Sequence, residues 1–177
     1  MITEYSKSSP PAQMVWASIW LDSRGHARRS PLVIMERDLD APHNGYTTRS
    51  YLTALKEGLV PYYQPGQVFM QDNARIHTSL DAREFLMDHG VWVMDWPPYS
   101  PDLNPIEHLW HRLKLIMYKE YPQFNQLGSS VEEVAAFYHA LKEAWLKIPN
   151  LLIRKVILSM PNRLAACRKS RGRQTKY

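Results

Sequence analysis

Two short apolar runs, separated by a segment of helix length, constrain the fold of this chain more than any other feature. The first run, residues 68–70, reads VFM and has the β-branched and aromatic residues of a buried strand. The second run, residues 91–94, reads VWVM. Thr78 and Gly90 are suited to begin and to follow a helix between the two runs. A strand, a helix and a strand of this length predict a βαβ unit with parallel strands.

A proline-rich loop, WPPYSPDLNP at residues 96–105, follows the second run. Its prolines fix φ and remove backbone donors, so the loop is expected to be stiff and irregular. Asn104 is a good N-cap for the next helix, Pro105 suits its first position, and Glu107 falls at its third. The sequence therefore places Glu107 on the first turn of a helix that begins just beyond the second strand.

Two carboxylates are expected to face one crevice. Asp72 and Asn73 follow the first strand, where side chains leave the carboxyl end of a sheet. Asp72 and Glu107 would then offer oxygen ligands that suit Mg²⁺ or Mn²⁺. Each acid alone also has an ordinary explanation, because an Asp-Asn pair commonly makes a turn and a Glu at the third position commonly caps a helix. No closed zinc site is indicated by the spacing of His77, His108 and His111.

Each acid lies within a long sequence motif, MQDNARIH at residues 70–77 for Asp72 and WPPYSPDLNPIEHLW at residues 96–110 for Glu107. Thirty-four residues lie between Asp72 and Glu107. In this order and at this distance, the two motifs resemble the catalytic core of the mariner superfamily of DDE transposases. The resemblance continues more weakly from about Met14 to the C-terminal TKY. It implies an α/β fold of the RNase H-like type, a mixed sheet flanked by helices, in one catalytic domain over residues 1–177.

The resemblance also implies roles for individual residues. In that family three acids bind two metal ions, and Asp72 matches the second acid and Glu107 the third, so Mg²⁺ or Mn²⁺ is the expected cofactor. Candidates to support these two acids are Asn73, His77, Asn104 and His111. The first acid would lie on a central strand ahead of Met1, so we expect an incomplete triad and a chain that is inactive alone. Two other acids, Glu4 and Asp22, are alternative ligands, although neither occupies the matching position.

The absence of that central strand would leave two pairs of strands without an inner partner. Residues 14–21 and 32–36 are predicted to form an antiparallel hairpin with a turn at residues 22–25. Three arrangements are open: the hairpin pairs with the strand at 68–71, the leader at residues 1–11 fills the gap, or the sheet stays split. We favour the first or the last, because the polar leader has poor strand composition. The basic residues 26–29 are interpreted as an exposed turn, and contact with DNA is the alternative.

Helix-start and helix-stop residues organise the rest of the chain. Thr48 is expected to begin a helix that Gly58 ends, and Ser130 with Glu133 forms a capping box for a helix that ends before Pro149. A last amphipathic segment is expected before Pro161. Beyond it, residues 162–177 are expected to form a basic tail.

The formal charge of +5 is concentrated at this tail. From Arg163 onward the chain has six basic residues and no acid, so a phosphate backbone is the natural partner of the tail. A merely solvated tail is the alternative. The DNA-binding candidates are Arg168, Lys169, Arg171 and Arg173. The resemblance implies transposon ends as the DNA, a nuclear location and a homo-oligomer.

Neither a membrane nor a disulfide is indicated. No apolar run approaches the roughly 20 residues of a membrane span, and the single cysteine, Cys167, fits a reducing compartment. Two other functions stay open beside the transposase. One is a non-catalytic DNA-binding or assembly module derived from such an enzyme. The other is a different metal hydrolase that takes a third ligand from His77, Asp95 or His111.

Overall fold

The computed structural model describes residues 13–98, 100–126, 130–171, 173 and 175. The predicted leader at residues 1–11 lies outside them. The elements, in chain order, are β1 Val15–Trp16, β2 Ile19–Leu21, β3 Ala27–Arg29, β4 Val33–Ile34, α1 Thr48–Gly58, β5 Val68–Phe69, α2 Arg75–Thr78, α3 Leu80–Asp88, β6 Trp92–Val93, η1 Pro101–Leu103, α4 Ile106–Glu120, η2 Pro122–Gln126, α5 Val131–Leu146, α6 Asn150–Leu158 and α7 Met160–Lys169.

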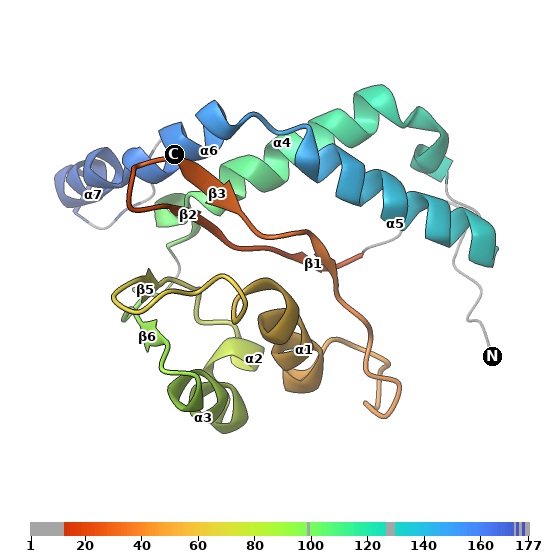
Figure 1. Ribbon diagram of the computed structural model, residues 1–177, viewed down its shortest axis with the longest axis horizontal. Helices are drawn as coiled ribbons and strands as arrows, with labels where there is room; N and C mark the ends of the chain where they lie inside the picture. Colours follow the sequence, from red (N-terminus) through yellow and green to blue (C-terminus); the bar gives the residue numbers. More distant parts are fainter. Residues whose placement is uncertain (1–12, 99, 127–129, 172, 174, 176–177) are drawn as a thin grey trace.

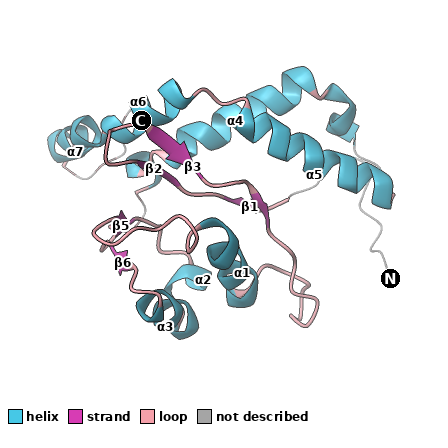
Figure 2. Ribbon diagram, in the orientation of Figure 1, coloured by secondary structure: helices cyan, strands magenta, loops and turns pink. Residues whose placement is uncertain are grey.

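The antiparallel strands β1 to β4 lie between two groups of helices (Figure 1). Helices α1, α2 and α3 and the β5–β6 pair lie on one side, and α4 to α7 lie on the other. Figure 2 shows how little of the chain is strand compared with helix. Because the strands are short, the helices supply most of the apolar surface that stabilises the fold.

Two separate hydrophobic clusters fill the space on either side of these strands. The first, here called the α4–α6 core, includes Leu109, Trp145 and Ile153, each fully buried. The second, the α1–α3 core, includes Tyr51 and Leu86. The antiparallel strands and their flanks contribute to both cores, with Ala17, Ala27 and Leu32 in the first and Val33 and Met35 in the second.

The predicted hairpin is present, but as two short ladders. β1 pairs with β4 and β2 pairs with β3, both antiparallel. The expected strand at residues 14–21 is interrupted at residues 17–18, where the Ser18 amide donates to the Ser30 hydroxyl and not to a backbone partner (2.9 Å). Each interrupted strand therefore has only two or three residues.

The prediction of an exposed turn at residues 26–29 was wrong, because these residues contribute β3. The turn closes earlier: the Asp22 carboxylate accepts the Arg24 and His26 amides, at 3.0 and 2.9 Å, and Gly25 has φ +77°. Because glycine adopts positive φ without strain, the chain reverses within residues 22–25. The residues that follow are then in register to pair with β2.

The βαβ unit is confirmed. β5 pairs with β6 in parallel, with Val68 opposite Trp92, and α2 and α3 form the crossover. The N-cap of α3 is Ser79, one residue after the predicted start, and Gly90 follows the helix at φ +63°. The expectation of buried strands was wrong, because the Val68 and Trp92 side chains are 40% and 66% exposed. One face of this pair packs on the α1–α3 core and the other meets solvent.

The C-terminal region is more helical than the sequence indicated. Ser130 and Glu133 form the predicted capping box at the start of α5. Pro161 does not end the last helix, because it occupies the first turn of α7, where a proline is tolerated. The segment expected as a basic tail from residue 162 is therefore helical as far as Lys169.

The strands do not join into one sheet. The described residues form three two-stranded sheets, β1–β4, β2–β3 and β5–β6, so the split arrangement is observed and the re-pairing of the hairpin with β5 is not. Among the helices of the described residues, none is long and apolar enough to cross a membrane.

Candidate metal centre

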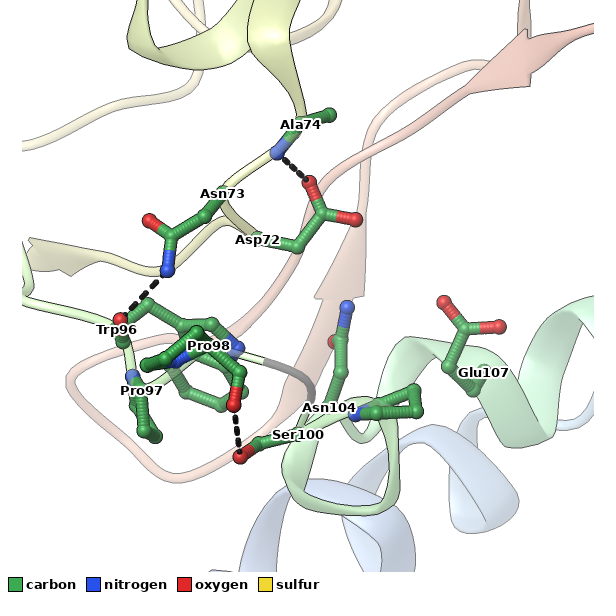
Figure 3. Close-up of a pocket in the computed structure, with 10 residues that line it drawn as sticks. Asp72, Asn73, Ala74, Trp96, Pro97, Pro98, Ser100, Asn104 and Glu107 are labelled. Carbon is green, nitrogen blue, oxygen red and sulfur yellow. Dashed lines mark hydrogen bonds between the residues drawn. The ribbon is translucent and has the colours of Figure 1, made fainter.

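Asp72 and Glu107 line the same pocket, which has a volume of about 320 Å³. Figure 3 shows their carboxylates turned toward the same open side, with the Asn104 side chain between them in this view. The complete lining is Asp72, Asn73, Ala74, Trp96, Pro97, Pro98, Ser100, Pro101, Asn104 and Glu107. The pocket therefore lies between the carboxyl end of β5 and the first turn of α4.

The two acids come from the two different cores. Asp72 follows β5, whose Phe69 packs on the α1–α3 core. Glu107 belongs to α4, whose Leu109 is fully buried in the α4–α6 core. The geometry of the pocket therefore depends on how these two packed units meet.

One oxygen of Asp72 is occupied and the other is open to a ligand. Its Oδ1 accepts the Ala74 amide at 3.1 Å and lies 2.6 Å from the His77 Nδ1. Its Oδ2 has no hydrogen-bond partner within the described part of the chain, and the side chain is 57% exposed. The turn expected of an Asp-Asn pair is thus present, and it orients the carboxylate while Oδ2 stays available to a ligand.

Behind Asp72, His77 is fixed by a buried tyrosine. The His77 ring lies 4.2 Å, centroid to centroid, from the ring of Tyr51, which has no exposed surface. The Tyr51 hydroxyl donates to the Gln71 Oε1, and the side-chain Nε2 of Gln71 donates to the His77 carbonyl at 3.4 Å. Burial, and secondly the negative charge of Asp72, raise the pKa of the Tyr51 hydroxyl. The phenol therefore stays protonated and keeps its role as a donor.

Two asparagines shape the proline loop. The side-chain Nδ2 of Asn73 donates to the Trp96 carbonyl at 2.7 Å and so links the end of β5 to the loop. The Asn104 Oδ1 accepts the Ile106 amide at 3.3 Å, which is the capping contact predicted for it, although the helix begins one residue later than expected. Both residues line the pocket.

The electrostatics of the pocket reflect the two acids. Desolvation, and then the negative charge of Asp72, raise the pKa of the Glu107 carboxyl above its usual value, while Lys114 opposes the shift. A carboxylate whose proton affinity is raised by a neighbouring negative charge also favours a cation beside it. The residue types and their placement therefore fit a divalent ion held by oxygen ligands.

Other residues proposed from the sequence lie elsewhere. His111 is exposed on α4 and does not line the pocket. Asp22 is engaged in the hairpin turn, and Glu4 lies outside the described residues. Among the residues that the structure describes, no group of three or more His, Cys, Asp or Glu side chains could hold a metal ion. A third ligand from His77, Asp95 or His111 is therefore not provided.

The basic candidates separate into buried and exposed residues. Arg163, the first of them, is only 1% exposed. The four DNA-binding candidates are exposed at the end of α7 and just beyond it: Arg168, Lys169, Arg171 and Arg173. The burial of Arg163 was missed because its partners are distant in the sequence. The support from Tyr51 was missed because an aromatic residue in an apolar helix looks like ordinary core.

Comparison with known proteins gives a family match and curated relatives. The family described as DDE superfamily endonucleases matches residues 42–127. The Tc1 transposase of Caenorhabditis elegans is 33% identical over 165 residues, which cover 93% of this chain and 54% of that relative. The chain thus spans about half the length of this relative.

Solved structures agree on the fold. The catalytic domain of Mos1 mariner transposase matches with a TM-score of 0.61 at 21% identity, covering 95% of this chain and 78% of that one. The Mos1 paired end complex with Mn matches with a TM-score of 0.59 at 21% identity, covering 98% and 48%. A further structure of that complex contains Mg.

The fold is thus RNase H-like, as it is in the catalytic domain of Mos1. Its pocket is lined by both of the acids that the two sequence motifs predicted, Asp72 and Glu107. With the family match over residues 42–127, these similarities are those of a Tc/mariner DDE transposase.

Proposed function

We propose that this chain is part of a transposase catalytic domain and contributes Asp72 and Glu107 to a centre that cuts and joins transposon DNA. One observation carries the proposal. The two acids embedded in the family's sequence motifs, 34 residues apart, come from different cores and yet line one pocket. A chance pair of surface acids would not be expected to converge in this way.

The cation that we propose at this pocket is Mg²⁺ or Mn²⁺. The relative Mos1 has been solved with each of these metals. A divalent ion there would activate a water or hydroxyl nucleophile and stabilise the developing charge on a phosphate. The chain's own residues would hold the ion through the Asp72 Oδ2 and the Glu107 carboxylate. His77 and the Ala74 amide would keep Asp72 in orientation.

We further propose that the isolated chain does not cleave DNA. Two-metal catalysis needs ions about 3.5–4 Å apart, and such a pair requires more ligands than two carboxylates. The described residues offer no third acid at the pocket. Activity would then require an additional acid from another segment or another chain.

For the DNA itself, we propose that the exposed cations after Arg163 contact phosphates. They carry the positive excess of the chain and do not line the pocket. A nuclear location and a homo-oligomer are proposed with the transposase function. If the cations bind DNA while the pocket binds no metal, the non-catalytic DNA-binding module becomes the better description.

Metal binding and cleavage test this proposal separately. Mn²⁺ binding, measured by water-proton relaxation, should weaken in Asp72→Ala and in Glu107→Gln. Asp95→Ala is the matched control, since Asp95 is exposed, follows β6 as Asp72 follows β5, and does not line the pocket. Equal Mn²⁺ binding by the wild type and Asp72→Ala would refute the site.

The cleavage assay uses supercoiled DNA with Mg²⁺ or Mn²⁺. We expect no nicking by the wild-type chain. Nicking that is lost in Asp72→Ala would contradict the expected inactivity, although it would support the site.

A further inference from the structure

We propose that the C-terminal helix α7 positions Glu107, and that Arg163 is the residue through which it acts. The inference rests on the proposed function of Glu107 as a metal ligand. The described part of residues 162–177 would then have two roles, because its buried residues support the pocket while its exposed residues are left for DNA.

The contacts of Arg163 carry the first step. Its side chain is 1% exposed and joins three elements. The Nε donates to the Ser159 hydroxyl at 2.8 Å, where α6 ends. The Nη1 donates to the Asp102 carbonyl at 2.5 Å, and the Nη2 lies 3.2 Å from the His108 Nδ1. One guanidinium thus links α7 to η1 and to the first turn of α4.

Asp102 is also held from a second direction. Its carboxylate accepts both the Thr175 amide, at 3.1 Å, and the Thr175 hydroxyl, at 2.7 Å. The backbone of Asp102 is therefore fixed by α7, and its side chain is fixed by the residues that follow α7. Two independent contacts from the C-terminal segment meet on this one residue of η1.

The path from Asp102 to Glu107 is short and stiff. Leu103 is buried, and the Asn104 Oδ1 accepts the Ile106 amide. Pro105 precedes the helix with a fixed φ, so few backbone torsions can absorb a displacement of η1. His108, the neighbour of Glu107, contacts Arg163 directly. A shift of α7 would therefore move the Glu107 carboxylate relative to Asp72.

The choice of arginine follows from this geometry. A planar guanidinium reaches Asp102 and His108 with two different nitrogens, whereas a lysine ammonium acts as one point charge on a flexible stem. Arg163→Lys should therefore keep the charge and lose the simultaneous contacts. Arg168→Lys is the matched control, because it makes the same chemical change at an exposed position of the same helix.

Two measurements on the full chain test the proposal. The first is amide hydrogen exchange across residues 102–108, which reports local opening of η1 and the start of α4. The second is the affinity for Mn²⁺ alone, measured by water-proton relaxation against the Asp72→Ala baseline. We expect Arg163→Lys to speed exchange in this segment by about tenfold or more and to weaken Mn²⁺ binding severalfold. Arg168→Lys should change neither.

Thr175→Val provides a second variant in which Arg163 is intact. It removes the hydroxyl contact with Asp102 and should give a smaller change of the same kind. Its retained fold, checked by its melting temperature, keeps the test valid if Arg163→Lys fails to fold.

The outcomes separate this inference from the proposed function. Equal exchange and Mn²⁺ affinity in Arg163→Lys and Arg168→Lys would overturn the inference. Faster exchange with unchanged Mn²⁺ binding would also overturn it, because α7 would then stabilise η1 without positioning Glu107. If wild-type binding of Mn²⁺ equals the Asp72→Ala baseline, the proposed function fails, and the positioning of a metal ligand fails with it.

Discussion

Replacing Gly58 with alanine should destabilise the fold although alanine is the better helix former. Gly58 is the last residue of α1 and is buried against the hairpin. A Cβ at this position would lie 2.4 and 2.6 Å from two ring carbons of Trp16 and 3.3 Å from a methyl group of Val33. The first two distances are far below van der Waals contact, so either the ring or the helix must move.

Neither movement is cheap. The Trp16 ring packs against Phe69, at a centroid distance of 6.5 Å, and the Gly58 carbonyl accepts the Ser18 hydroxyl at 2.7 Å. Overpacking of this kind costs about 1–3 kcal/mol. Alanine recovers at most about 1 kcal/mol of helix propensity, and less at a final position. The net loss should be about 1–2 kcal/mol, which corresponds to a decrease in Tm of about 2–8 °C for a domain of this size.

Thermal and urea denaturation measure this loss. Gly45→Ala is the control, because a Cβ there meets nothing within 4 Å, and its stability should match or slightly exceed that of the wild type. In a Trp16→Leu background, Gly58→Ala should cost much less, since the ring that it strikes is absent. A Gly58→Ala protein as stable as the wild type would show that α1 and β1 are packed less tightly than the distances indicate.

Three further predictions concern charge and capping. Ser130→Ala should cost about 1 kcal/mol in urea denaturation by removing the N-cap of α5, and an unchanged midpoint would contradict this. Hydrogen bonds from the His26 amide above all, and then from Arg28 and Arg24, lower the pKa of Asp22 from an ordinary 3.8 to about 2. The stability that Asp22 adds is therefore present above pH 4 and is lost as the pH falls to about 2, so the difference between the wild type and Asp22→Asn should shrink over that window. In DNA-binding titrations, the slope of log affinity against log salt concentration should flatten by up to about 3.6 units when four cations are neutralised: Arg168, Lys169, Arg171 and Arg173. An unchanged slope would refute the role of the tail.

The sequence predicted the features that local residue patterns specify. The βαβ unit, the Ser130–Glu133 capping box and the glycine after α3 each depend on residues close together in the chain. The pairing of Asp72 with Glu107 was predicted from two sequence motifs, and both acids line one pocket in the structure.

Features that depend on distant partners were not predictable in this way. The two cations Arg163 and Arg168 look alike in sequence, yet Arg163 is buried. Its acceptors lie in η1 and α4, about 60 residues away in the chain, so no local pattern indicates them. The break between β1 and β2 arises because a serine hydroxyl across the hairpin replaces a backbone acceptor. Such choices are made by tertiary packing, which overrides local preference.

The division into two cores has a consequence for the order in which the chain folds during synthesis. All members of the α1–α3 core have been synthesised once residue 93 has been added, whereas the α4–α6 core needs helices that extend to Leu158. The Trp145 indole, for example, donates to the Ser30 carbonyl across a separation of 115 residues. At about 5–20 residues per second, several seconds separate the two events. The Asp72 side of the pocket is therefore able to fold several seconds before the side that carries Glu107.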